Sequence, residues 1–200
     1  MGSRRVGILA IQGDVDAHAQ ALLRVGAAPV PVLAEKDLGE IDALVLPGGE
    51  STTIAKGLDR LGLYGPLRAF ADSGRPVLGT CAGAILLAKE SENHPVRTLE
   101  LIDVVARRNA YGTQVDSFAA EADAPEAGDG PEALSLAPLR CIFIRAPRLT
   151  ALGPDVEVLL RVDREPVLVR QGNVFACTFH PELGEDARVH GLVAGAAAIA

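Results

Sequence analysis

The chain has 200 residues, a formal net charge of −7 at pH 7 and 48% hydrophobic residues. This composition indicates a globular domain with a full core and excludes an intrinsically disordered chain. The negative charge argues against nucleic acid or an anionic membrane surface as the main partner, and no apolar run approaches the roughly 20 residues of a membrane span.

Strands alternate with helices in the first half of the chain. Residues 6–11 form an apolar strand, and the helix that follows is capped by Asp14 and stopped by Gly26. Further strands are predicted at residues 29–33, 42–46, 76–78 and 102–106. This alternation predicts an α/β fold of three layers, with a mostly parallel central sheet flanked by helices.

The second half begins with residues 119–138, which are rich in Ala, Asp, Glu, Gly and Pro and are predicted to form an exposed loop. The last strands are expected to pair as antiparallel hairpins, with a turn at residues 171–173. These strands are predicted at residues 141–144, 156–162, 167–169 and 174–179, and a closing helix at 187–199. We expect one domain over residues 1–200.

Three of the predicted strands end in small or polar residues. Gly48 and Gly49 follow one strand, Cys81 follows the next, and His180 follows a third. In an open α/β sheet, sites form outside the carboxyl ends of the strands. The sequence therefore predicts one crevice that brings these residues together.

The run from Gly79 to Gly83 has the Gly-x-nucleophile-x-Gly spacing of a sharp turn between a strand and a helix, with Cys81 at its centre. A cysteine in this position is suited to attack a carbonyl and form a thioester. His180 would accept the thiol proton, and Glu182 would hold the imidazole tautomer. This chemistry requires no metal and no organic cofactor.

The tetrahedral oxyanion of such a reaction needs preorganised donors. The backbone N–H groups of Gly49 and Ala82 are the candidates, and glycine at position 49 leaves room for the substrate to approach the backbone. Glu50 and Ser51 are also suited to cap the next helix.

The remaining cysteines and histidines are not expected in the site. Cys141 and Cys177 lie within apolar strands and are interpreted as buried filler. For His18, His94 and His190 we expect surface or helix-face positions, because no cysteine or carboxylate accompanies them. Three widely spaced cysteines, with no signal peptide before the first strand, favour a reduced cytoplasmic compartment.

Short motifs along the chain, in order, resemble the class I glutamine amidotransferases and, more narrowly, the family of glutaminase subunits of pyridoxal 5'-phosphate synthase. The resemblance covers residues 6–190. The motifs are AIQGD (10–14), PGGESTT (47–53), GTCAG (79–83), RRNAYG (107–112), IRAP (144–147) with VRQGN (169–173), and FHPE (179–182).

The resemblance implies hydrolysis of L-glutamine to glutamate and ammonia, and delivery of the ammonia to a separate synthase subunit. It places Gln12 where the family contacts that partner, and Arg108 at the glutamine α-carboxylate, although the residues alone do not favour Arg108 over Arg107. The substrate-binding residues that it implies are Gly48, Gly49, Glu50, Arg108, Ile144 and Arg145.

Two alternatives remain open. In the first, the chain is a glutaminase subunit of another synthase, such as that for imidazole glycerol phosphate. In the second, it is a non-catalytic thiol sensor on the same fold. The motif around Gln12 and the run at Arg108 count against the first. The second predicts no use for His180 and Glu182, so replacing either would leave a sensor intact.

Overall fold

The computed structural model describes residues 3–93, 95–108, 117–124 and 135–195. Several sequence-based predictions therefore lie outside the described residues. These are His94, residues 109–112 of the arginine motif, residues 125–134 of the predicted loop, and residues 196–199 of the closing helix.

A seven-stranded sheet forms the centre of the molecule, with the strand order β10-β11-β12-β4-β3-β1-β2. The five strands from β12 to β2 run parallel, and β10 and β11 are antiparallel at one edge. The strands are β1 (Arg5–Leu9), β2 (Ala28–Val32), β3 (Ala43–Leu46), β4 (Val77–Thr80), β10 (Glu157–Val162), β11 (Glu165–Gln171) and β12 (Val174–Cys177). The predicted α/β fold, the hairpins and the turn at residues 171–173 are confirmed.

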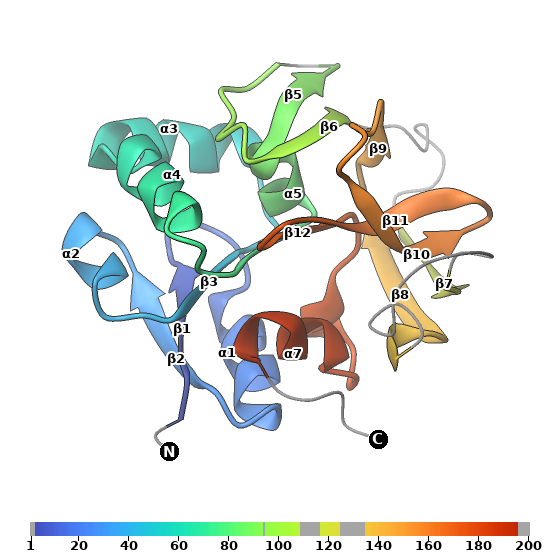
Figure 1. The fold of residues 1–200 in the computed structure, drawn as a ribbon, viewed down its shortest axis with the longest axis horizontal. Helices are drawn as coiled ribbons and strands as arrows, with labels where there is room; N and C mark the ends of the chain where they lie inside the picture. The colour runs from blue at the N-terminus through green and yellow to red at the C-terminus, as the bar shows by residue number, and fades with distance from the viewer. Residues whose placement is uncertain (1–2, 94, 109–116, 125–134, 196–200) are drawn as a thin grey trace.

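Helices cover both faces of this sheet, which gives the three layers that the alternation predicted (Figure 1). One face carries α1 (Val15–Arg24) and α7 (Arg188–Ala194), and the other carries α2 (Glu35–Leu38), α3 (Ser51–Leu61), α4 (Tyr64–Asp72) and α5 (Ala82–Leu87). Each central strand is buried on both sides, as expected for parallel strands between helices.

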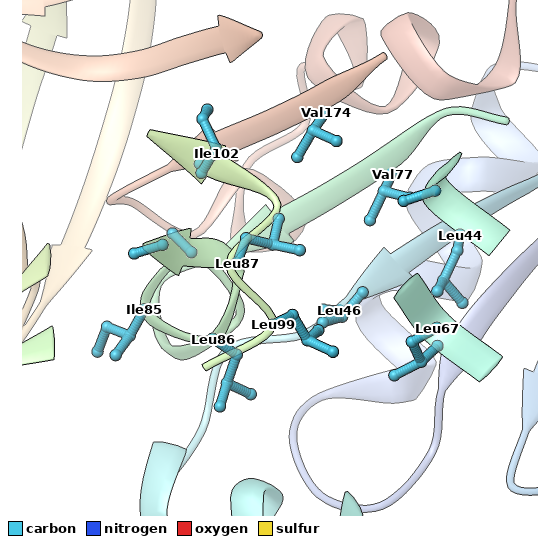
Figure 2. Packing of buried hydrophobic residues seen from close by; sticks show 14 of the residues in the cluster. Leu44, Leu46, Leu67, Val77, Ile85, Leu86, Leu87, Leu99, Ile102 and Val174 are labelled. Atoms are coloured by element: carbon cyan, nitrogen blue, oxygen red, sulfur yellow. The ribbon is translucent and has the colours of Figure 1, made fainter. Parts of the chain in front are cut away.

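Successive residues of β3 feed two separate cores. Leu44 and Leu46 pack under α3, α4 and α5 (Figure 2), whereas Ala43 and Val45 belong to the cluster under α1 and α7. This alternation follows from the two-residue period of a strand. The sheet is therefore packed against helices on both of its faces.

Two small sheets flank the central one. The first joins β5 (Ala88–Glu92), β6 (Ile102–Arg107) and β9 (Arg148–Thr150), and the second pairs β7 (Ser117–Ala122) with β8 (Leu139–Ile144). The prediction of a loop was therefore wrong for residues 119–122. The Phe118 ring stacks on Phe143 with the ring centroids 4.6 Å apart, and this cross-strand packing outweighs the weak strand preference of the alanines and glutamate that follow.

Candidate active site

Cys81 occupies a strained turn between β4 and α5. Its backbone dihedrals are φ 47° and ψ −103°, a conformation that non-glycine residues rarely adopt. Its N–H donates to the carbonyl of Cys177 on the neighbouring strand at 2.9 Å. The predicted turn is thus present, and it presents the thiol at the carboxyl end of the sheet.

His180 follows β12 and lies beside the cysteine. Its N–H donates to the carbonyl of Ile142 at 2.8 Å, which ties the loop to β8. Its Nδ1 lies 2.7 Å from Oε1 of Glu182, which is buried in the short 3-10 helix Pro181–Leu183. Gly48 packs against this ring, because a Cβ atom at that position would lie 2.6 Å from Cε1 of His180 and 3.4 Å from Cβ of Cys81.

The electrostatic environment of His180 favours the imidazolium form. Burial alone would lower its pKa, but hydrogen bonds and charge interactions with Cys81 and Glu182 outweigh burial and raise the pKa to about 10. His180 therefore carries a proton at neutral pH, with Nδ1–H donating to the carboxylate of Glu182.

A pocket of about 300 Å³ opens in front of the thiol. This volume lies at the lower end of the range for small-molecule sites. Its lining residues are Gln12, Gly49, Glu50, Ser51, Cys81, Ala82, Ile85, Arg108, Ile144, Arg145 and His180. Arg108 faces the pocket, whereas Arg107 on β6 is exposed and forms an ion pair with Glu92.

The residues predicted for the site thus come together, most of them in the pocket wall and two behind it. Gly48 lies behind His180 and Cys81, and Glu182 lies behind His180. Two lining residues were not predicted for the pocket: Ile85, which follows Cys81 by one helical turn, and Ser51, which was expected only as a helix cap.

Gln12 and Arg145 shape the rim of the pocket. The side-chain oxygen of Gln12 accepts the backbone N–H of Glu50 at 2.8 Å. Gly49, which precedes Glu50, has φ 145°, and a Cβ atom on Gly49 would lie 2.8 Å from the Gln12 side-chain oxygen. Across the pocket, Arg145 Nη2 donates to Glu50 Oε1 at 3.3 Å. Arg145 also has a positive φ of 43°, a second strained position beside Cys81.

The other cysteines are buried, as predicted. Burial raises the pKa of Cys141 to about 12 and that of Cys177 well above its ordinary value. Both thiols therefore stay protonated at neutral pH.

His18 and His190 lie on the helices α1 and α7, which is one of the two expected positions, but both are fully buried and His18 is accompanied by a carboxylate, contrary to the prediction. His18 Nε2 lies 3.5 Å from Glu182 Oε2, and its Nδ1 lies 2.9 Å from Nε2 of His190. The helical spacing of His18 with Ala21, Leu22 and Val25 was the available signal, since it places His18 on the apolar face of α1.

A thiol beside an imidazole that a carboxylate orients is the arrangement that nucleophilic catalysis by cysteine requires. The adjacent pocket provides space for a small substrate, with a guanidinium group from Arg108 in its wall. Within the described residues, no helix is both long and apolar enough to cross a membrane, and no group of three or more His, Cys, Asp or Glu side chains is arranged to hold a metal ion.

Known proteins are similar to this chain over nearly its whole length. Residues 8–196 match the SNO glutamine amidotransferase family. The chain is 50% identical to pyridoxal 5'-phosphate synthase subunit PdxT of Frankia alni over 194 residues, which is 96% of this chain and 94% of the relative. It is 47% identical to the PdxT subunit of Desulforudis audaxviator over 186 residues, which is 93% of this chain and 95% of the relative.

A solved structure described as a glutamine amidotransferase superimposes with a TM-score of 0.84 and 42% sequence identity, covering 95% of this chain and 98% of that chain. The similarity in sequence and the similarity in fold thus both extend over nearly the whole chain.

Proposed function

Because the chain belongs to the SNO glutamine amidotransferase family, we propose that it is the glutaminase subunit of a pyridoxal 5'-phosphate synthase. It hydrolyses L-glutamine to L-glutamate and ammonia, and the ammonia passes to the synthase subunit. The observation that carries this proposal is the arrangement of Cys81 and His180 in the pocket wall with Glu182 behind His180.

In the proposed reaction His180 takes the proton of the Cys81 thiol, and the sulfur attacks the side-chain amide carbon of glutamine. The resulting oxyanion is stabilised by the backbone N–H groups of Gly49 and Ala82, each contributing about 3 kcal/mol to lowering the barrier. The imidazolium of His180 gives its proton to the departing nitrogen, so that ammonia leaves and a thioester remains. Water then attacks the thioester, with neutral His180 as the base, and glutamate and the free thiol result.

Substrate binding is assigned to the pocket wall. Arg108 meets the α-carboxylate of glutamine, because a guanidinium group binds a carboxylate through two parallel hydrogen bonds. Gly48, Gly49, Glu50, Ile144 and Arg145 bind the rest of the substrate. The exposed pair of Glu50 and Arg145 at the rim supports this assignment, since both side chains reach the entrance of the pocket.

The partner is proposed to be the synthase subunit, with Gln12 at the contact and no role for nucleic acid or membrane. Gln12 is suited to this position because it holds the backbone of Glu50, so a partner that moves Gln12 also moves the Gly49 peptide. A cytoplasmic location stays a prediction.

The test is release of glutamate from L-glutamine by the wild type and by Cys81→Ala, each with and without purified pyridoxal 5'-phosphate synthase subunit. We expect turnover that rises with the partner and disappears in Cys81→Ala. Turnover that ignores the partner would assign the glutaminase to another synthase. No Cys81-dependent turnover under either condition would overturn the proposal and favour a thiol sensor.

A further inference from the structure

A buried polar chain continues behind Glu182, away from the pocket. Oε1 of Glu182 accepts from His180, but Oε2 is buried and accepts no hydrogen bond from the described residues. A buried carboxylate oxygen without a donor is costly. Nε2 of His18 lies 3.5 Å from this oxygen.

His18 is itself held from two sides. Its Nε2 lies 3.3 Å from the hydroxyl of Thr80 on β4, and its Nδ1 lies 2.9 Å from Nε2 of His190 on α7. The side chains of His18 and His190 are completely excluded from solvent. These contacts join α1, α7 and the end of β4 directly behind the site.

Both histidines are neutral at neutral pH. Burial lowers the pKa of His18, against the opposing effects of Glu182 and Asp14, while His180 lowers it further. Burial also lowers the pKa of His190 well below its ordinary value, assisted by the charges of His18 and Arg24. A neutral imidazole has one donor and one acceptor nitrogen, so the tautomer of His18 decides what faces the carboxylate.

The contacts favour the Nε2–H tautomer of His18. With the proton on Nε2, an N–H faces Glu182 Oε2 and Thr80, and Nδ1 accepts from Nε2–H of His190. With the proton on Nδ1, a nitrogen lone pair would face the carboxylate, and His190 would bury an N–H at its own Nδ1, which has no partner among the described residues.

We propose that His18 is a positioning residue, which holds Glu182 through an Nε2–H donor while His190 fixes its tautomer. The proposal rests on the proposed glutaminase function of the triad. Glu182 can orient His180 only if its own rotation is restrained, and the contact of Oε2 with the Nε2–H of His18 at 3.5 Å contributes to that restraint. His180 then keeps the direction in which its Nε2 proton meets the departing ammonia.

Two variants of His18 separate positioning from packing. In His18→Gln the amide nitrogen takes the place of Nε2 and keeps the donor toward Glu182, whereas in His18→Asn the amide oxygen takes the place of Nδ1 and keeps only the acceptor for the Nε2–H of His190. We expect kcat, measured with the synthase subunit present, to fall roughly 10- to 100-fold in His18→Asn, with KM nearly unchanged and His18→Gln close to wild type. Equal loss of kcat in both variants, in proportion to lost thermal stability, would overturn the proposal.

The tautomer is measured on the unmodified protein by the ¹⁵N chemical shifts of the His18 ring. We expect a protonated Nε2 and an unprotonated Nδ1. A proton on Nδ1 would overturn the proposal whatever the variants do.

Alkylation of Cys81 by iodoacetamide over a range of pH gives a readout that does not depend on glutamine as the substrate, with Cys81→Ala as the blank. We expect the midpoint of the alkylation profile to move to higher pH in His18→Asn and to stay in place in His18→Gln. An unmoved midpoint in His18→Asn would contradict the positioning role. Absence of Cys81-dependent glutamate release in the wild type would instead refute the proposed function.

Discussion

A Cβ atom on Gly79 would lie 2.6 Å from the carbonyl carbon of Gly83. The two glycines that flank Cys81 therefore touch each other across the turn, and Gly83 also packs directly on the carbonyl of Leu46 at the end of β3. The spacing of the motif follows from this contact, because the first turn of helix α5 touches the backbone of both β4 and β3. The nucleophile is consequently mounted where the start of helix α5 packs directly on the backbone of β3 and β4.

The first prediction concerns Gly83→Ala. The new methyl group would meet the backbone of Leu46, which cannot move without disturbing β3, so we expect a loss of about 1–3 kcal/mol in the free energy of unfolding. Urea denaturation measures this loss as a lower midpoint with an unchanged slope. Gly65→Ala is the control, because a Cβ there meets no atom within 4 Å in helix α4, and it should be neutral or slightly stabilising. Equal midpoints for the two variants would contradict the packing argument.

The sequence predicts the central sheet and its turn because both depend on local signals. Apolar runs mark the buried strands, and the spacing of Gly79, Cys81 and Gly83 marks the turn. Among the strands of the small sheets, β6 and β8 carry such apolar runs and were predicted, whereas β5, β7 and β9 lack them. Strand β5, for example, continues directly from helix α5 at Ala88 and is fixed by pairing with β6, which lies further along the chain.

The contact between His18 and His190 lies beyond sequence analysis for the same reason. The two residues are 172 positions apart, and only the packing of α7 against α1 brings their rings together. The apolar spacing of α1 indicates that His18 is buried, but not that it meets Glu182.

The second prediction is the titration of His180. Its ordinary pKa is 6.5, and although burial opposes the charge, Cys81 and Glu182 raise the pKa to about 10. In Glu182→Gln the carboxylate charge is lost, so we expect a lower pKa for His180, measured by the ¹³Cε1 shift of the ring. A similar decrease is expected in Cys81→Ala. An unchanged pKa in both variants would show that the two neighbours do not stabilise the imidazolium.

The same raised pKa predicts how stability changes with pH. The folded protein retains a proton on His180 that the unfolded chain releases above pH 6.5, so this contribution is full below pH 6.5 and is lost as the pH rises through about 10. Urea denaturation across that interval should show a steeper loss for wild type than for His180→Gln, in which the titrating group is absent. Parallel curves would contradict the prediction.

The third prediction compares two neighbouring arginines. Arg108 lines the pocket, whereas Arg107 is exposed in an ion pair with Glu92 at 3.8 Å. We expect Arg108→Lys to raise the KM for glutamine by roughly tenfold or more, because lysine keeps the charge but loses the planar fork that binds a carboxylate. Arg107→Lys should leave KM unchanged. If both substitutions had the same effect, Arg108 would have no specific role at the α-carboxylate.

The last prediction concerns Gln12, whose side-chain oxygen accepts the N–H of Glu50 next to the proposed oxyanion donor at Gly49. Gln12→Met preserves length but removes the acceptor, so the Gly49–Glu50 peptide, which directly follows the peptide that carries the Gly49 N–H, is less well fixed. We expect kcat in the presence of the synthase subunit to fall by roughly tenfold, since a small displacement of an oxyanion donor is enough to weaken it. Gln20→Met makes the same chemical change on the exposed side of α1 and should leave kcat unaltered. Thermal stability should change little in either variant, because Glu50 is exposed and water can replace the lost acceptor. A Gln12→Met variant with full kcat would mean that Gly49 keeps its geometry without this hydrogen bond, and that the oxyanion donor is fixed by the turn between β3 and α3 alone.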